Sequence, residues 1–193
     1  EQAPALAEVG AGIQISANAF HVMRHLGLEA KLLATGVRPG AYVFKLHDTG
    51  EEIQRFSLSA EHERQHGAPY VQLHRADLHE ILAARARELK PDVVRLDHRL
   101  VDFTQDQNGV EVRFANGAVA RGDLLIGADG LKSVVRKKLW GDAPATYTGD
   151  GAWRIVVPVE KLPKPFLDLV MNVFMGPGGH AVCYYLRAGA LLN

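Results

Sequence analysis

The spacing of apolar side chains predicts three helices. Residues 16–27 place apolar side chains at helical spacing between cap candidates and the stop residue Gly27. Residues 75–89 carry a longer apolar stripe that falls on one side of a helix. A third helix is expected to begin near Leu131. Its inward-facing side chains are expected to be Val134, Val135 and Leu139.

Runs of apolar and β-branched residues between turn signals predict strands in much of the remaining chain. Residues 43–46 and 53–56 flank the turn sequence Asp-Thr-Gly at 48–50, which predicts a hairpin. A strand over 70–74 is expected to lead directly into the longest helix.

Two Asn-Gly pairs predict an antiparallel meander between residues 93 and 122. The pairs at 108–109 and 116–117 separate three strand-like segments, and both residue types tolerate the positive φ that hairpin turns need. Residues 123–130, with the sequence DLLIGADG, are then expected to form a buried strand that ends in a tight turn.

Composition changes after about Trp140, where Gly and Pro become frequent. Strands of a second sheet are expected over residues 153–159, 167–175 and 180–186. We therefore place a domain boundary near Tyr147, which divides the chain into residues 1–146 and 147–193. Helices and strands together predict an α/β protein.

Composition and charge exclude several classes of protein. The chain has 193 residues, with 22 Lys plus Arg and 22 Asp plus Glu, and this balance argues against a nucleic-acid-binding domain. Cys183 is the single cysteine, which excludes an intrachain disulfide and a cysteine-based zinc site and fits a reducing cytoplasm. No apolar run approaches the roughly 20 residues that cross a bilayer, so no membrane segment is predicted.

The glycine-rich turn at residues 10–15 departs from a dinucleotide-binding fingerprint. That fingerprint needs a preceding strand and three glycines, whereas here no strand precedes the turn and Ile15 takes the third position. We expect a flexible turn, and contact with a cofactor held by other elements stays open.

Acidic residues mark two further candidate sites. An acidic residue at the end of the second strand of a dinucleotide-binding unit binds ribose hydroxyls, and Glu1 would hold that position if the glycines preceded it. Residues 127–130, GADG, lie between an expected strand and an expected helix, where backbone amides suit phosphate and the Asp129 carboxylate suits sugar hydroxyls. A solvated Glu1 and a simple Asp-Gly turn are the alternatives.

Four segments carry a resemblance to a known family. They are EQAP at 1–4, VGAGIQISANA at 9–19 followed by HLGL at 25–28, HRADLHEIL at 74–82 and GADGLKSVVR at 127–136. With these motifs in this order, the chain resembles the class A flavoprotein monooxygenases, which are FAD-dependent aromatic hydroxylases. It is most similar to the branch containing salicylate hydroxylase, 3-hydroxybenzoate 6-hydroxylase and 6-hydroxynicotinate 3-monooxygenase.

The resemblance implies seven cofactor-binding positions. They are Glu1, Gln2, Gln14, Arg75, Leu100, Asp129 and Gly130. In such enzymes Glu1 would bind the adenosine ribose, and Arg75 would reach the flavin's phosphate region, where a cationic fork suits an anion. Asp129 and Gly130 match a motif that serves both FAD and NAD(P)H. Some relatives have histidine at the position of Gln14, which leaves an acid–base role there open.

The resemblance also implies His180 and Tyr184 as catalytic residues that face the substrate ring. Residues i and i+4 of a strand share one face at a separation of about 13 Å, so both side chains could line one cavity. A histidine can accept the phenol proton near neutral pH and raise the electron density of the ring.

The implied fold is a p-hydroxybenzoate hydroxylase-like, Rossmann-type FAD-binding domain with a β-rich substrate domain, as a fragment truncated at both ends. The implied reaction is hydroxylation of a small hydroxylated aromatic acid with FAD, NAD(P)H and molecular oxygen. No metal is implied, and a homodimer stays open. Two alternatives remain: a monooxygenase for a larger polyketide or quinone-like substrate, or a fragment that cannot hold FAD and has no activity of its own.

Overall fold

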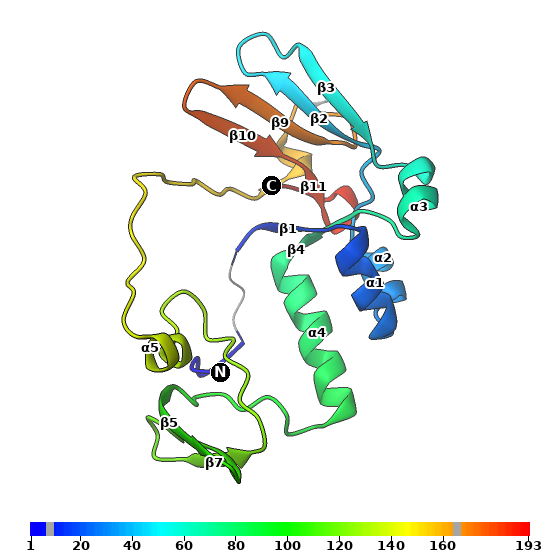
Figure 1. The fold of residues 1–193 in the computed structure, drawn as a ribbon. Helices are drawn as coiled ribbons and strands as arrows, with labels where there is room; N and C mark the ends of the chain where they lie inside the picture. The colour runs from blue at the N-terminus through cyan, green and yellow to red at the C-terminus, as the bar shows by residue number, and fades with distance from the viewer. Residues whose placement is uncertain (7–9, 164–166) are drawn as a thin grey trace. The chain divides into compact units, whose positions relative to one another are not determined.

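The computed structural model describes residues 1–6, 10–163 and 167–193. The chain divides into two compact units (Figure 1), which are described separately. The smaller unit comprises Glu1–Ala7 and Lys90–Ala152, and the larger unit comprises Glu8–Leu89 and Trp153–Asn193. Val9, part of one of the motifs behind the family resemblance, lies outside the described residues. The boundary near Tyr147, which divides the chain by expected function, stays a prediction.

The larger unit is built around a two-stranded antiparallel ribbon. Strand β1 (Gly12–Ile15) pairs with β4 (Val71–His74). Four helices accompany the ribbon: α1 (Ala17–His25), α2 (Glu29–Thr35), α3 (Ala60–His66) and α4 (Arg75–Leu89). The helices predicted over 16–27 and 75–89 are confirmed as α1 and α4.

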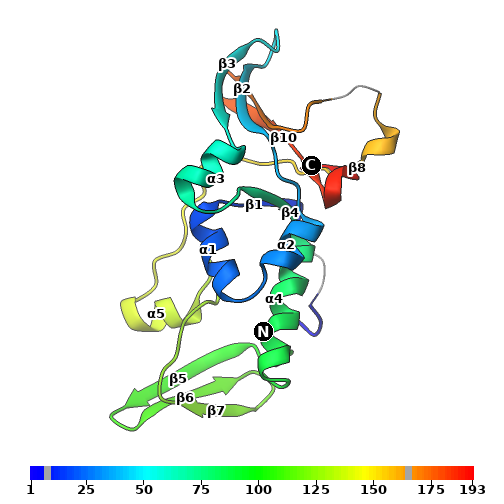
Figure 2. The ribbon, with the colours of Figure 1, turned by 90° about the vertical axis from the view of Figure 1, so that its right-hand side faces the viewer.

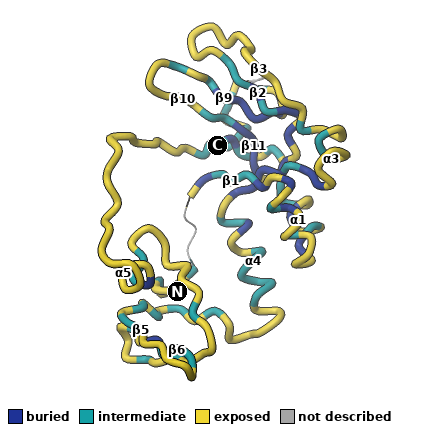
Figure 3. Tube along the Cα trace, in the orientation of Figure 1, coloured by how far each residue is buried: buried dark blue, intermediate teal, exposed yellow. Residues whose placement is uncertain are grey.

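One face of the ribbon forms an apolar core with helices α1, α2 and α4. Its buried members include Ile15, Phe20, Leu28, Leu32, Val71, Leu73 and Leu78. Figure 3 shows the buried residues of this region in dark blue. Alternation along β4 sends Val71 and Leu73 into this core, so Gln72 and His74 point to the opposite face.

A four-stranded sheet lies on that opposite side of the ribbon (Figure 2). Its strand order is β10-β9-β2-β3. The strands are β2 (Ala41–Leu46), β3 (Glu52–Ser57), β9 (Met171–Gly176) and β10 (Gly179–Cys183). The predicted hairpin is confirmed as β2–β3, with a bulge at Phe44/Lys45. Because β2 also pairs in parallel with β9, the sheet combines strands from both sides of the predicted boundary near Tyr147.

Three two-residue strands complete the larger unit. They are β8 (Val157–Pro158), β11 (Tyr185–Leu186) and β12 (Leu191–Leu192), in the order β11-β12-β8. Short 3₁₀ turns follow two of them, η1 (Val159–Lys161) and η2 (Arg187–Gly189). The strand expected over 153–159 is therefore wrong except at β8, since only Val157 and Pro158 find a pairing partner.

The smaller unit contains the predicted meander and one helix. Its elements are β5 (Leu100–Asp106), β6 (Gly109–Phe114), β7 (Val119–Gly122) and α5 (Val134–Trp140). The three strands pair in sequence as an antiparallel sheet, which confirms the meander. Phe103, Val110 and Val112 pack with Val135 of α5 as its core.

The predicted buried strand over 123–130 is wrong. These residues form no strand, and Leu124 and Ile126 are 77% and 79% exposed. A strand needs a neighbour for its backbone groups, and no described strand pairs with this segment. The helix expected near Leu131 begins at Val134, and of its three predicted inward residues only Val135 is buried.

No helix in the described part of the chain combines the length and the apolar character needed to cross a membrane.

Candidate functional site

The glycine-rich turn before β1 supports the side chain of Arg75. The Arg75 amide, at the start of α4, donates a hydrogen bond to the Ala11 carbonyl at 2.8 Å. A Cβ on Gly10 would lie 3.0 Å from Arg75 Cδ, and Gly10 has φ +110°, a value that side chains other than glycine's rarely allow. The glycine-rich turn therefore contacts Arg75 through both its backbone and its side chain. The predicted flexibility of this turn stays a prediction.

The guanidinium of Arg75 is available to an anionic ligand. Arg75 is exposed, and within the described ranges no carboxylate forms an ion pair with it. An exposed cationic fork beside a glycine turn suits phosphate oxygens, because the missing side chains let a ligand approach the backbone.

The Tyr184 ring lies directly against Gly12, the first residue of β1. A Cβ on Gly12 would come within 2.2 Å of the Tyr184 hydroxyl oxygen and within 2.5 Å of two ring carbons. No side chain larger than hydrogen fits there while the ring keeps its place. Gly12 is thus required for the close approach of Tyr184 to β1.

Asn193 ties Tyr184 to the same strand. The amide of Gly12 donates to Asn193 Oδ1 at 2.9 Å. The backbones of Tyr184 and Asn193 exchange two hydrogen bonds of 3.1 and 2.9 Å. Three hydrogen bonds and a ring contact therefore hold Tyr184 against Gly12.

The face of the ribbon toward Tyr184 is polar, and we call it the polar face. It carries Gly12 and Gln14 from β1 opposite His74 and Gln72 from β4. The Gln72 backbone exchanges both of its hydrogen bonds with Val37 on its other side. Gln14 and Gln72 therefore form a non-hydrogen-bonded pair, whose side chains start close together.

Gln72 carries a buried amide with unused hydrogen-bonding capacity. The residue is 1% exposed, and neither Nε2 nor Oε1 has a hydrogen-bond partner among the described residues. A buried polar group that makes no hydrogen bond costs free energy, so an apolar side chain of similar shape should stabilise the fold.

Gln72→Met is expected to raise the free energy of unfolding by about 1 kcal/mol or more, because it removes this desolvation cost and keeps the volume. Urea denaturation measures the change. Gln54→Met, at an exposed position of β3, is the matched control and should change stability by less than about 0.5 kcal/mol. A destabilised Gln72→Met variant would show instead that the amide is hydrogen-bonded in solution.

Tyrosines gather beside the polar face. Tyr42, Tyr70 and Tyr184 pack around Met171, and the Tyr70 hydroxyl donates to Met171 Sδ at 3.6 Å. Burial raises the pKa of Tyr70 and of Tyr184, with nearby Tyr42 adding to both shifts and Arg154 partly offsetting the second. Both phenols therefore stay protonated at neutral pH; Tyr70 donates its proton to Met171, and Tyr184 has a hydroxyl proton to donate.

His180 lies on β10, on the same face of the sheet as Tyr184. It is exposed and opposite Met175 of β9, and Val182 stands opposite Val173 two residues further on. Alternation then brings Tyr184 to this face, where it packs on Met171. The shared face agrees with the predicted pair, and the catalytic roles stay predictions.

Glu1 lines a hollow of the smaller unit. Its carboxylate accepts the Ala3 amide at 2.8 Å, and the His98 amide donates to its carbonyl at 2.8 Å. The hollow encloses about 420 Å³, with Val93, Arg95, His98 and Phe114 among its other lining residues. Gln2 is exposed beside Glu1, and Leu100 begins β5 opposite Phe114.

The Asp129 carboxylate caps helix α5. It accepts hydrogen bonds from the Ser133 hydroxyl and from the amides of Val134 and Val135, at 2.7 and 3.2 Å for the amides. Burial alone would raise the pKa of Asp129, but these hydrogen bonds outweigh it and lower the pKa. Gly130 follows with φ +80°, which suits a turn that only glycine adopts readily.

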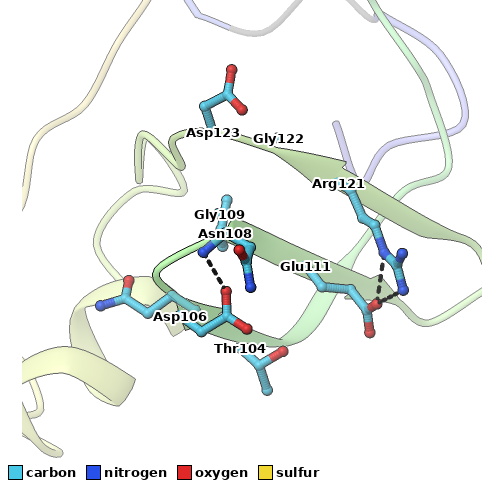
Figure 4. A pocket seen from close by; sticks show the side chains of 10 residues that line it. Thr104, Asp106, Asn108, Gly109, Glu111, Arg121, Gly122 and Asp123 are labelled. Carbon is cyan, nitrogen blue, oxygen red and sulfur yellow. Dashed lines mark hydrogen bonds and ion pairs between the residues drawn. The ribbon is translucent and has the colours of Figure 1, made fainter.

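Another hollow of the smaller unit lies on the meander, at the turn between β5 and β6 (Figure 4). It encloses about 580 Å³ and includes Thr104, Asp106 and the ion pair of Glu111 with Arg121 at 2.8 Å. Its lining contains none of the predicted site residues, and Glu111 and Arg121 in it are already paired with each other. We therefore assign no chemistry to it.

The predicted site residues are divided between the two units. Gln14, Arg75, His180 and Tyr184 belong to the larger unit, and Glu1, Gln2, Leu100, Asp129 and Gly130 to the smaller. Sequence reasoning missed Gly12, Gln72 and Asn193 as site residues. The polar Gln72 between two apolar residues of a predicted strand was the available signal for a polar face.

Comparisons with known families and proteins show what this chain is similar to. A family model described as FAD binding domain matches residues 5–177. The chain is 41% identical over 189 residues to 3-amino-4-hydroxybenzoate 2-monooxygenase of Streptomyces cremeus, covering 98% of this chain and 47% of that protein. It is 34% identical over 193 residues to 3-hydroxybenzoate 6-hydroxylase 1 of Aquipseudomonas alcaligenes, covering 100% of this chain and 49% of that protein.

A solved structure shows the same fold. The structure of HpxO from Klebsiella pneumoniae, complexed with FAD and uric acid, matches with a TM-score of 0.75 and 26% identity over 97% of this chain and 47% of that one. The chain spans about half the length of the relatives that it matches. These matches confirm the resemblance to FAD-dependent aromatic monooxygenases and the predicted fold class.

Proposed function

Because the chain belongs to the FAD-binding domain family of aromatic monooxygenases, we propose that it forms the cofactor-binding part, and one wall of the substrate site, of such an enzyme. The proposed reaction is hydroxylation of a small hydroxylated aromatic acid with NAD(P)H and molecular oxygen. One observation carries the proposal: the predicted cofactor cation Arg75 contacts Gly10, and the predicted substrate residue Tyr184 contacts Gly12, two residues further along the chain.

The residues of the larger unit fit FAD on two counts. Arg75 packs against Gly10, and its guanidinium is exposed and has no ion pair among the described residues, as binding of an anionic diphosphate requires. The buried amide of Gln72 lies on the polar face beside Gln14, with its hydrogen-bonding capacity unused. In the smaller unit, Glu1 would bind the ribose, and Asp129 with Gly130 would contact the cofactor from the turn that caps α5.

Bound FAD would supply the redox chemistry, and the protein's own groups would orient the aromatic ring. The protonated Tyr184 phenol would donate a hydrogen bond to the substrate, and His180 would accept the proton of its ring hydroxyl. Apolar and aromatic neighbours on this face, among them Met171, would exclude water from the ring.

The test of the function is a spectrum followed by a substrate screen. Purified protein supplied with FAD should show bound flavin absorbance, and NAD(P)H oxidation should be stimulated by salicylate, a hydroxybenzoate or hydroxynicotinate. Absence of bound flavin would favour the alternative that this chain by itself cannot hold FAD.

One observation favours a second candidate, a monooxygenase for a larger substrate. Tyr42 and Phe44 have ring centroids 5.0 Å apart, and Phe44 contacts Phe56 edge to face at 6.2 Å. This aromatic row extends the His180 face to the edge strand β3, where Phe56 is 53% exposed. Stimulation by a polycyclic quinone and not by single-ring acids would support this candidate.

His180→Ala is expected to lower the hydroxylation rate about 100-fold or more, since it removes the proposed proton acceptor, while FAD stays bound. Rapid-mixing kinetics and the flavin spectrum measure the two properties. The control is His79→Ala, at an exposed position of α4, which should leave both unchanged. Equal FAD loss in His180→Ala and Arg75→Ala would contradict the division of roles between cofactor and substrate residues.

A further inference from the structure

An ion pair joins the helix of Arg75 to the turn that follows Tyr184. Arg187 Nε donates to Asp77 Oδ2 at 3.0 Å, and Arg187 Nη2 donates to Asp77 Oδ1 at 2.8 Å. This two-pronged geometry is the strongest form of an arginine–carboxylate pair. Asp77 lies in the first turn of α4, two residues after Arg75, and its side chain is only 15% exposed.

The backbone around Arg187 is held in an unfavourable conformation. Arg187 and Ala188 have φ values of +49° and +53°, and Gly189 follows at +94°. Two adjacent non-glycine residues in the left-handed region persist only when the surroundings impose this conformation. The Asp77 carboxylate holds the Arg187 side chain with two hydrogen bonds and so contributes to fixing this conformation.

The strained turn is short and lies between the two segments that hold Tyr184 in place. It connects β11, which begins at Tyr185, to β12, which leads to Asn193. Tyr184 and Asn193 are the residues that exchange backbone hydrogen bonds and hold the ring against Gly12. A displacement of the turn would therefore move both attachments of Tyr184.

We propose that the Arg187–Asp77 ion pair holds Tyr184 in contact with Gly12 and fixes its position relative to Arg75. The ion pair thereby links the tyrosine proposed to face the substrate to α4, the helix that begins with the proposed cofactor-binding residue Arg75. The inference deepens the proposed function and rests on it. Arg187 and Asp77 are positioning residues, since they act through Tyr184 and through α4.

Variants of the two ion-pair residues test the proposal by hydrogen exchange. Asp77→Asn and Arg187→Gln should each speed amide exchange across residues 184–193 about threefold to tenfold, and the double variant should exchange no faster than the single ones. Arg187→Lys keeps the charge but lacks the planar guanidinium, so its exchange rate should lie between those of wild type and Arg187→Gln. The matched control is Glu88→Gln, which removes the ion pairs with Lys31 and Arg85 at the other end of α4 and should leave this segment unchanged.

A ligand measurement separates positioning from general stability. In protein loaded with FAD, Asp77→Asn should weaken binding of 3-hydroxybenzoate, the probe, by about threefold to tenfold, as the flavin absorbance change reports. Unchanged exchange at 184–193 would overturn the proposal, and so would faster exchange with unchanged probe affinity. If wild-type protein holds no FAD, or binds neither 3-hydroxybenzoate nor salicylate nor hydroxynicotinate, the proposed function fails, while the exchange result still decides whether the ion pair holds Tyr184.

Discussion

Gly12→Ala is expected to destabilise the protein by about 1–3 kcal/mol, because the added Cβ would overlap three atoms of the Tyr184 side chain. The Tyr184 ring must move away from position 12, so affinity for the aromatic substrate should fall as well. Denaturant unfolding gives the stability change, and substrate titration of the FAD-loaded protein gives the affinity.

A double-mutant cycle identifies the cause. Tyr184→Leu removes the ring, so alanine at position 12 should cost much less in that background, with a coupling of about 1 kcal/mol or more. Gly40→Ala is the matched control, because the nearest atom to its added Cβ is at 3.9 Å, an ordinary contact. If Gly12→Ala and Gly40→Ala were equally mild, the close approach of Tyr184 to β1 would be refuted.

Arg75→Ala is expected to weaken FAD binding about 10-fold to 100-fold. The variant would remove the proposed charge-assisted contact to the diphosphate, and such contacts contribute about 1.5–3 kcal/mol. Arg75→Lys should recover only part of the affinity, since a lysine ammonium lacks the planar fork. The dissociation constant of FAD, from flavin fluorescence during titration, is the measurement.

The control for this variant is Arg87→Ala, which removes an exposed charge from the last turn of the same helix. It should leave FAD affinity within experimental error and unfolding free energy within about 0.5 kcal/mol. Equal affinity in wild type and Arg75→Ala would show that the phosphate is held by other groups.

Local elements of the fold could be predicted from the sequence where local signals suffice. Helical spacing with a stop glycine predicted α1, and the two Asn-Gly pairs predicted the meander of β5, β6 and β7. The segment 123–130 shows where such reasoning fails. Its apolar run is typical of a buried strand, but burial requires a covering neighbour, and the described strands provide none.

The candidate site was predicted unevenly for the same reason. Motif resemblance named Arg75, His180 and Tyr184, since each stands in a recognisable string of residues. Gly12 and Asn193 were missed, because their importance comes from contacts between segments more than 170 residues apart, where Gly12 donates to Asn193.

The sequence by itself determined the family of this protein, the residue types available for cofactor and substrate, and the helices and hairpins that depend on near neighbours along the chain. Only the tertiary structure decided that β2 pairs with β9, that Tyr184 rests on Gly12, and that Arg187 reaches Asp77. The physical reason is that local propensity acts through adjacent backbone and side-chain geometry. Non-local pairing depends on which surfaces the whole chain can bury together.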